Sequence, residues 1–104
     1  MSRSESLAEY FRVQARRRLD RVESRDDGRN AKCALALLDT AVYAASLPED
    51  DPLILVLDEA GCFGPLGCEG FDPGEAGNRL VRHWQGGEPH ELLLALPAAI
   101  AAAT

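Results

Sequence analysis

Residues 29–46 read RNAKCALALLDTAVYAAS, and this stretch decides the expected fold. Its apolar side chains recur at intervals of three or four positions and leave only a narrow polar stripe; they include Ala34, Leu35, Leu38, Ala41, Val42 and Ala45. A helix that is apolar around most of its circumference is usually buried. The sequence therefore predicts a helix over residues 29–46 that lies at the centre of the fold and ends before Pro48.

The segment before it, residues 6–25, predicts a second long helix. Ser6 and Glu9 fit a capping box, in which a hydroxyl and a carboxylate each accept a hydrogen bond from a free backbone N–H at a helix start. One side of this helix is apolar at helical spacing; its members are Leu7, Phe11, Ala15, Leu19 and Val22. Asp27 and Gly28 are turn residues and predict the link to residues 29–46.

Residues 52–60 follow an aspartate and begin with proline, a combination typical of a helix start, and Gly61 is a typical helix stop. The alternative is a buried strand over residues 53–57, which would make the fold α+β. We favour the helix because Leu92–Leu96, the one run that could pair with such a strand, has no β-branched residue.

The remaining chain predicts two more helices and one irregular loop. Residues 73–85 form the first helix, and the second begins at Pro89 and is expected to kink or break at Pro97. Residues 61–72, GCFGPLGCEGFD, are too rich in glycine for regular structure. The expected fold is a single all-α domain over residues 1–104, a compact five-helix bundle with a Gly-rich loop between its third and fourth helices.

Charge is unevenly distributed in a chain whose net charge is −6. Residues 1–32 carry nine basic and six acidic side chains, whereas residues 33–104 carry two basic and eleven acidic ones. Arg17, Arg21 and Arg25 form an i,i+4 row that could bind phosphates, and hence nucleic acid. Acidic residues interleave with this row and no nucleic-acid-binding motif accompanies it, so this function is the less favoured alternative.

The clearest candidate for a metal site is a set of two cysteines and two histidines: Cys62, Cys68, His83 and His90. Two thiolates and two imidazoles can bind Zn²⁺ tetrahedrally. Five residues separate the cysteines, however, which is more than structural zinc sites usually have. A metal- or thiol-dependent protein centred on Cys62 and Cys68 is therefore a second alternative.

The chain offers no catalytic signature, and we expect neither an enzyme nor a cofactor. Its first residues have no apolar core of a secretory signal, and the apolar run near its end is too short to cross a membrane. With an odd number of cysteines, these features predict a cytoplasmic protein with reduced thiols and no membrane association.

The favoured function is a small helical module that binds another protein or itself. Apolar residues of the glycine-rich loop and the last helix could exceed what one core can bury. A homodimer contact is predicted to involve Phe63, Phe71, Leu93, Leu96 and Ile100.

Overall fold

Five α-helices make up the part of the chain that the computed structural model describes, residues 2–21, 23–25, 27–64 and 70–103. They are α1 (Arg3–Leu19), α2 (Arg29–Ala45), α3 (Pro52–Glu59), α4 (Gly74–Arg82) and α5 (Pro89–Ala102). No strand occurs among these residues. The all-α prediction is confirmed, and residues 53–57 belong to a helix.

The first helix begins earlier than its sequence predicts. Ser2 is the N-cap, and its hydroxyl oxygen accepts a hydrogen bond from the backbone N–H of Glu5 at 3.1 Å. Ser6, the predicted cap, lies inside α1 and is buried. The helix also ends at Leu19, so the predicted end at Arg25 is wrong.

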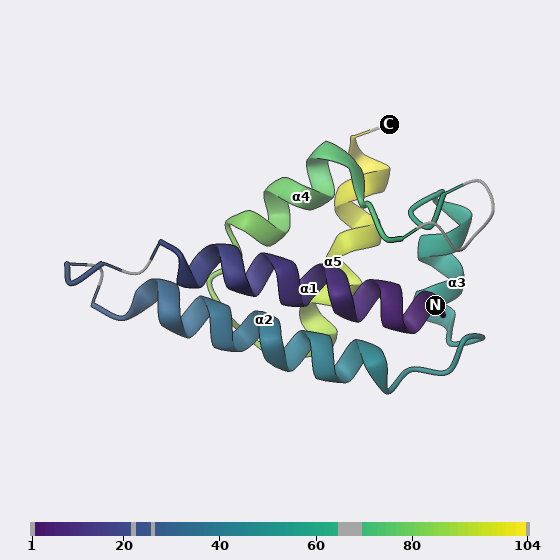
Figure 1. Ribbon diagram of the computed structural model, residues 1–104. Helices are drawn as coiled ribbons and strands as arrows, with labels where there is room; N and C mark the ends of the chain where they lie inside the picture. The colour runs from purple at the N-terminus through teal and green to yellow at the C-terminus, as the bar shows by residue number, and fades with distance from the viewer. Residues whose placement is uncertain (1, 22, 26, 65–69, 104) are drawn as a thin grey trace.

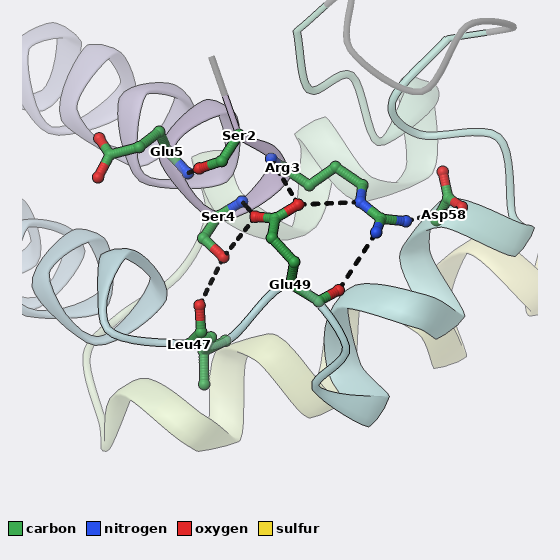
Figure 2. A network of polar contacts seen from close by, with 7 residues as sticks. All are labelled: Ser2, Arg3, Ser4, Glu5, Leu47, Glu49 and Asp58. Carbon is green, nitrogen blue, oxygen red and sulfur yellow. Dashed lines mark hydrogen bonds and ion pairs between the residues drawn. The ribbon is translucent and has the colours of Figure 1, made fainter.

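A second set of hydrogen bonds explains this early start (Figure 2). The carboxylate of Glu49, in the link between α2 and α3, accepts from the backbone N–H groups of Arg3 at 3.1 Å and Ser4 at 2.9 Å. The Ser4 hydroxyl donates to the Leu47 carbonyl at 2.6 Å, and the Arg3 guanidinium pairs with both Glu49 and Asp58. The first N–H groups of α1, which have no partner within the helix, are thus satisfied by a residue far along the chain.

Two other helix starts follow from local sequence. The Asp51 side chain accepts from the N–H of Leu53 at 2.9 Å, and Pro52 has no N–H to satisfy. Asp72 accepts from the N–H of Gly74 at 2.9 Å, although α4 begins one residue later than predicted. Helix α5 starts at Pro89 as expected, but it is not broken at Pro97.

The helices form two layers (Figure 1). Helices α1 and α2 lie side by side as an antiparallel hairpin, and α5 crosses behind it and contacts α2, α3 and α4. The core lies between these layers; its buried apolar residues are Leu7, Ala8, Phe11, Ala15, Ala34, Leu37, Ala41, Ala44, Ile54, Leu57, Cys62, Phe63, Val81, Leu92, Leu93 and Leu96. The radius of gyration, 13.4 Å, is close to the value of about 13 Å expected for a compact domain of this length.

The prediction that residues 29–46 lie at the centre of the fold is wrong. Only one side of α2 faces the core, through Leu37, Ala41, Ala44 and their neighbours. The opposite side is in solvent because a second layer covers α2 from one direction only. Helix α5, which contacts three other helices, is the more central element.

Within the described part of the chain, no helix combines the length and apolar character that crossing a membrane requires.

Candidate functional site

The residues predicted to form a dimer contact belong mainly to the core. Phe63, Leu93 and Leu96 are fully buried within the monomer, so they offer no surface to a partner. Phe71 and Ile100 are partly buried and pack against the same core. Phe71 lies with its ring centroid 5.1 Å from that of Tyr10 and 5.3 Å from that of Phe63. The apolar surface predicted here is therefore mostly internal, because Phe63, Phe71 and α5 pack against the rest of the core.

The predicted metal ligands that the structure describes, Cys62, His83 and His90, do not form a metal site with one another. Cys62 is buried, and burial together with the nearby Asp72 carboxylate raises the pKa of its thiol, which keeps it protonated. His83 caps the end of α4 and His90 lies in the first turn of α5, both exposed. Cys68 lies outside the described residues. Among those described, no three His, Cys, Asp or Glu side chains are placed to hold a metal ion.

The predicted row of arginines is rearranged by the early end of α1. Arg25 lies in the turn between α1 and α2, and is exposed. Arg17 and Arg21 instead line a narrow crevice together with Arg18 and Arg82. The Arg18 guanidinium donates to the Arg82 carbonyl, while its Nε is buried without a hydrogen-bond partner. Sequence reasoning missed Arg82 because it comes from α4.

The largest departure from expectation is the outer face of α2. Leu35 is 61% exposed, Leu38 37% and Val42 71%, and all three point away from the core. Half-buried Ala31 and Ala45 continue the row at either end. We call these five residues, Ala31, Leu35, Leu38, Val42 and Ala45, the α2 seam.

The seam has a spacing that sequence analysis could have recognised. Its members are separated by four, three, four and three residues, which is the a/d pattern of a coiled coil. Leu37 and Ala44, which reach the core, fall on the opposite side of the same helix. The sequence thus contains two apolar faces, one packed against the core and one exposed, instead of the single wide buried face that it predicts.

A shallow groove of about 360 Å³ runs along one flank of the seam. Lys32, Leu35, Ala36 and Asp39 line it from α2, and residues 85–87, between α4 and α5, line it from the other side. Two of these three linker residues are glycines, which leave the groove open to a second helix.

Scattered exposed apolar side chains are common, but a contiguous row on one helix indicates a binding surface. The other large apolar side chains that are exposed in the described chain are spread over several helices; they are Val13, Leu19, Leu55, Val56 and Leu94. The α2 seam is therefore the candidate site that the geometry favours.

Comparison with protein families, with curated proteins and with solved structures finds no match for this chain.

Proposed function

We propose that the protein is a small cytoplasmic helical interaction module that binds another helix through the α2 seam. The observation that carries the proposal is the exposure of Leu35 and Val42 in one row on a helix whose other side is anchored in the core. Amphipathic helices commonly dock by such anchors at spacings of three, four and seven residues. The buried free thiols of Cys33 and Cys62 suit a reducing compartment.

The seam can supply useful binding energy without any change of shape. Fully burying a Leu or Val side chain contributes about 1.5–3 kcal/mol, and most of the surface of Leu35 and Val42 is available for this. The backbone groups of α2 are engaged within the helix, so recognition would come from side chains. A rigid helix also loses little conformational entropy when it binds.

The test compares two variants that place a charge on exposed apolar positions. Val42→Glu is expected to abolish capture of partners from the host cell, whereas Leu94→Glu, on α5 and 58% exposed, should leave capture intact. Both should change the free energy of unfolding by less than about 0.5–1 kcal/mol, because neither side chain is in the core. Quantitative mass spectrometry of affinity-purified protein measures the first effect, and thermal melting the second.

Equal capture by Val42→Glu and the wild type would refute the proposal. Loss of capture by Leu94→Glu alone would move the binding surface to α5.

A second candidate function is binding of a polyanion such as nucleic acid, favoured by the convergence of Arg17, Arg18, Arg21 and Arg82. The positive charge of these guanidinium groups would attract phosphates to this end of the molecule. Acidic side chains dominate the rest of the chain, so a polyanion would have to approach this end of α1.

Binding of a labelled single-stranded oligonucleotide tests this candidate. Fluorescence anisotropy should show affinity that falls steeply with salt, and Arg17→Glu should lower it about tenfold or more while Arg12→Glu, on the same helix outside the crevice, has less effect. Binding that is absent, or unchanged between low and moderate salt, would exclude this function.

A further inference from the structure

We propose that the α2 seam pairs with the same seam of a second copy of the chain, in antiparallel orientation, to form a two-fold symmetric dimer. This inference rests on the proposed function, because it names the partner of the same surface. It replaces the dimer contact expected from the sequence, whose central residues Phe63, Leu93 and Leu96 are buried.

The seam has the register that a two-helix contact needs. Leu35 and Val42 occupy a positions of a heptad, and Ala31, Leu38 and Ala45 occupy d positions. Positions a and d of an antiparallel pair face each other across the contact. Leu35 of one copy then meets Leu38 of the other, and Val42 meets Ala31, so a large side chain faces a small one at each end.

Two charged residues beside the seam favour a second copy of the chain over an unrelated helix as the partner. Lys32 and Asp39 are both exposed, and both flank the seam at e positions, seven residues apart. In an antiparallel pair, e positions of the two helices face each other. The register set by Leu35 and Leu38 places Lys32 of each copy beside Asp39 of the other, which gives two symmetric ion pairs.

The charges of Lys32 and Asp39 are available to form ion pairs with a second copy. Among the described residues, Lys32 and Asp39 take part in no ion pair with another side chain. Both line the groove beside α2, whose far wall contains Gly86 and Gly87. The two glycines carry no side chains, so at these positions the wall lets the second helix come close enough for the charges to meet.

Parallel pairing does not use these charges. In a parallel pair, e positions face g positions of the other helix. The g positions here are Ala34 and Ala41, which are uncharged and buried against the core. Self-complementarity of Lys32 and Asp39 therefore selects the antiparallel arrangement.

The size of the contact sets the expected strength. Helix α2 has 17 residues and is about 25 Å long, so the paired surfaces fall at the lower end of the range for specific interfaces. We expect a reversible dimer with a dissociation constant in the micromolar range.

The experiment measures self-association by sedimentation velocity at low salt, from low to high micromolar concentration. Lys32→Asp and Asp39→Lys each replace two attractive pairs by two repulsive ones, so each should weaken the dimer about tenfold. The double variant Lys32→Asp/Asp39→Lys restores both attractions with reversed sign and should associate as the wild type does. Asp50→Lys, an exposed acid outside the seam with the same charge change, should have little effect.

Thermal melting of each variant shows that its monomer is folded, which is expected because the changed side chains are exposed. A wild-type protein that remains monomeric at high micromolar concentration overturns the inference. So does a dimer that is insensitive to both single reversals, or one that the double variant does not restore.

Failure of this inference is distinguishable from failure of the proposed function. A monomeric wild type whose Val42→Glu variant loses capture of a different protein retains the α2 seam as a binding surface and excludes self-pairing. A monomeric wild type whose capture is unaffected by Val42→Glu excludes both.

Discussion

Leu93→Ala is expected to lower the free energy of unfolding by about 2–5 kcal/mol, which is a large fraction of the stability of a domain this small. Leu93 is fully buried in α5, the helix that contacts α2, α3 and α4. Removing its side chain loses the transfer free energy of the buried atoms and leaves a cavity that three neighbouring helices cannot all fill by shifting. Urea unfolding followed by circular dichroism measures the change in midpoint and slope.

The adjacent residue provides a matched control. Leu94 is 58% exposed on the same turn of α5, so Leu94→Ala removes the same atoms without opening a core cavity. It should change the free energy of unfolding by no more than about 0.5–1 kcal/mol. Equal losses for the two variants would contradict the orientation of α5, and with it the burial that removes Leu93 from the predicted dimer contact.

The second large effect is expected at Glu49, which holds the start of α1. Hydrogen bonds from the backbone N–H of Ser4 and from Arg3 stabilise its charged form and lower the pKa of this carboxyl from 4.5 to about 2. Only the ionised carboxylate accepts all of these bonds, and the positive end of the α1 dipole adds to the attraction. Glu49 thus joins α1 to the link between α2 and α3.

The direction of the pH dependence follows from the lowered pKa. Because the folded state binds the proton less readily than the unfolded state, the stabilisation is complete above pH about 4.5 and is lost as pH falls toward about 2. The Glu49 side chain is 44% exposed, so solvent screening reduces the contribution to about 1–2 kcal/mol.

Glu49→Gln tests this contribution, since it keeps the shape of the side chain and removes the charge. We expect a loss of about 1–2 kcal/mol at neutral pH and a much smaller difference from the wild type near pH 2. Glu59→Gln, an exposed carboxyl at the end of α3, is the control. Denaturant unfolding at a series of pH values measures both, and a Glu49→Gln deficit that persists undiminished at acid pH would contradict the assignment.

Local signals in the sequence determined which segments are helical. Asp51 and Pro52 start α3, and Pro89 starts α5, because caps and proline act on the backbone within a few residues. The same reasoning misplaced the start of α1. Ser6 and Glu9 form a plausible local cap, but Glu49 satisfies the first N–H groups from 45 residues away. No local pattern carries that information.

The sequence shows that the residues of the α2 seam are apolar, but it does not show that they are exposed. Of the predicted row, Arg17 and Arg21 line one crevice and Arg25 does not, whereas Arg82 joins them only through the packing of α4. The apolar pattern predicts that Leu35 and Val42 are buried, but both are exposed. Leu93 and Leu96, which it predicts at a surface, are fully buried. The burial of these side chains on α2 and α5 is therefore the reverse of the prediction.

By itself, the sequence determined the five helices found in the described part of the chain, because hydrophobic spacing, caps and stops act over distances of a few residues. Only the tertiary structure decided which apolar faces meet. Helix α2 carries apolar side chains around most of its circumference, and a two-layer fold has room to cover one side of it. Burial depends on what lies opposite each helix, and residues distant in the chain supply that neighbour, which is why the α2 seam is left in solvent.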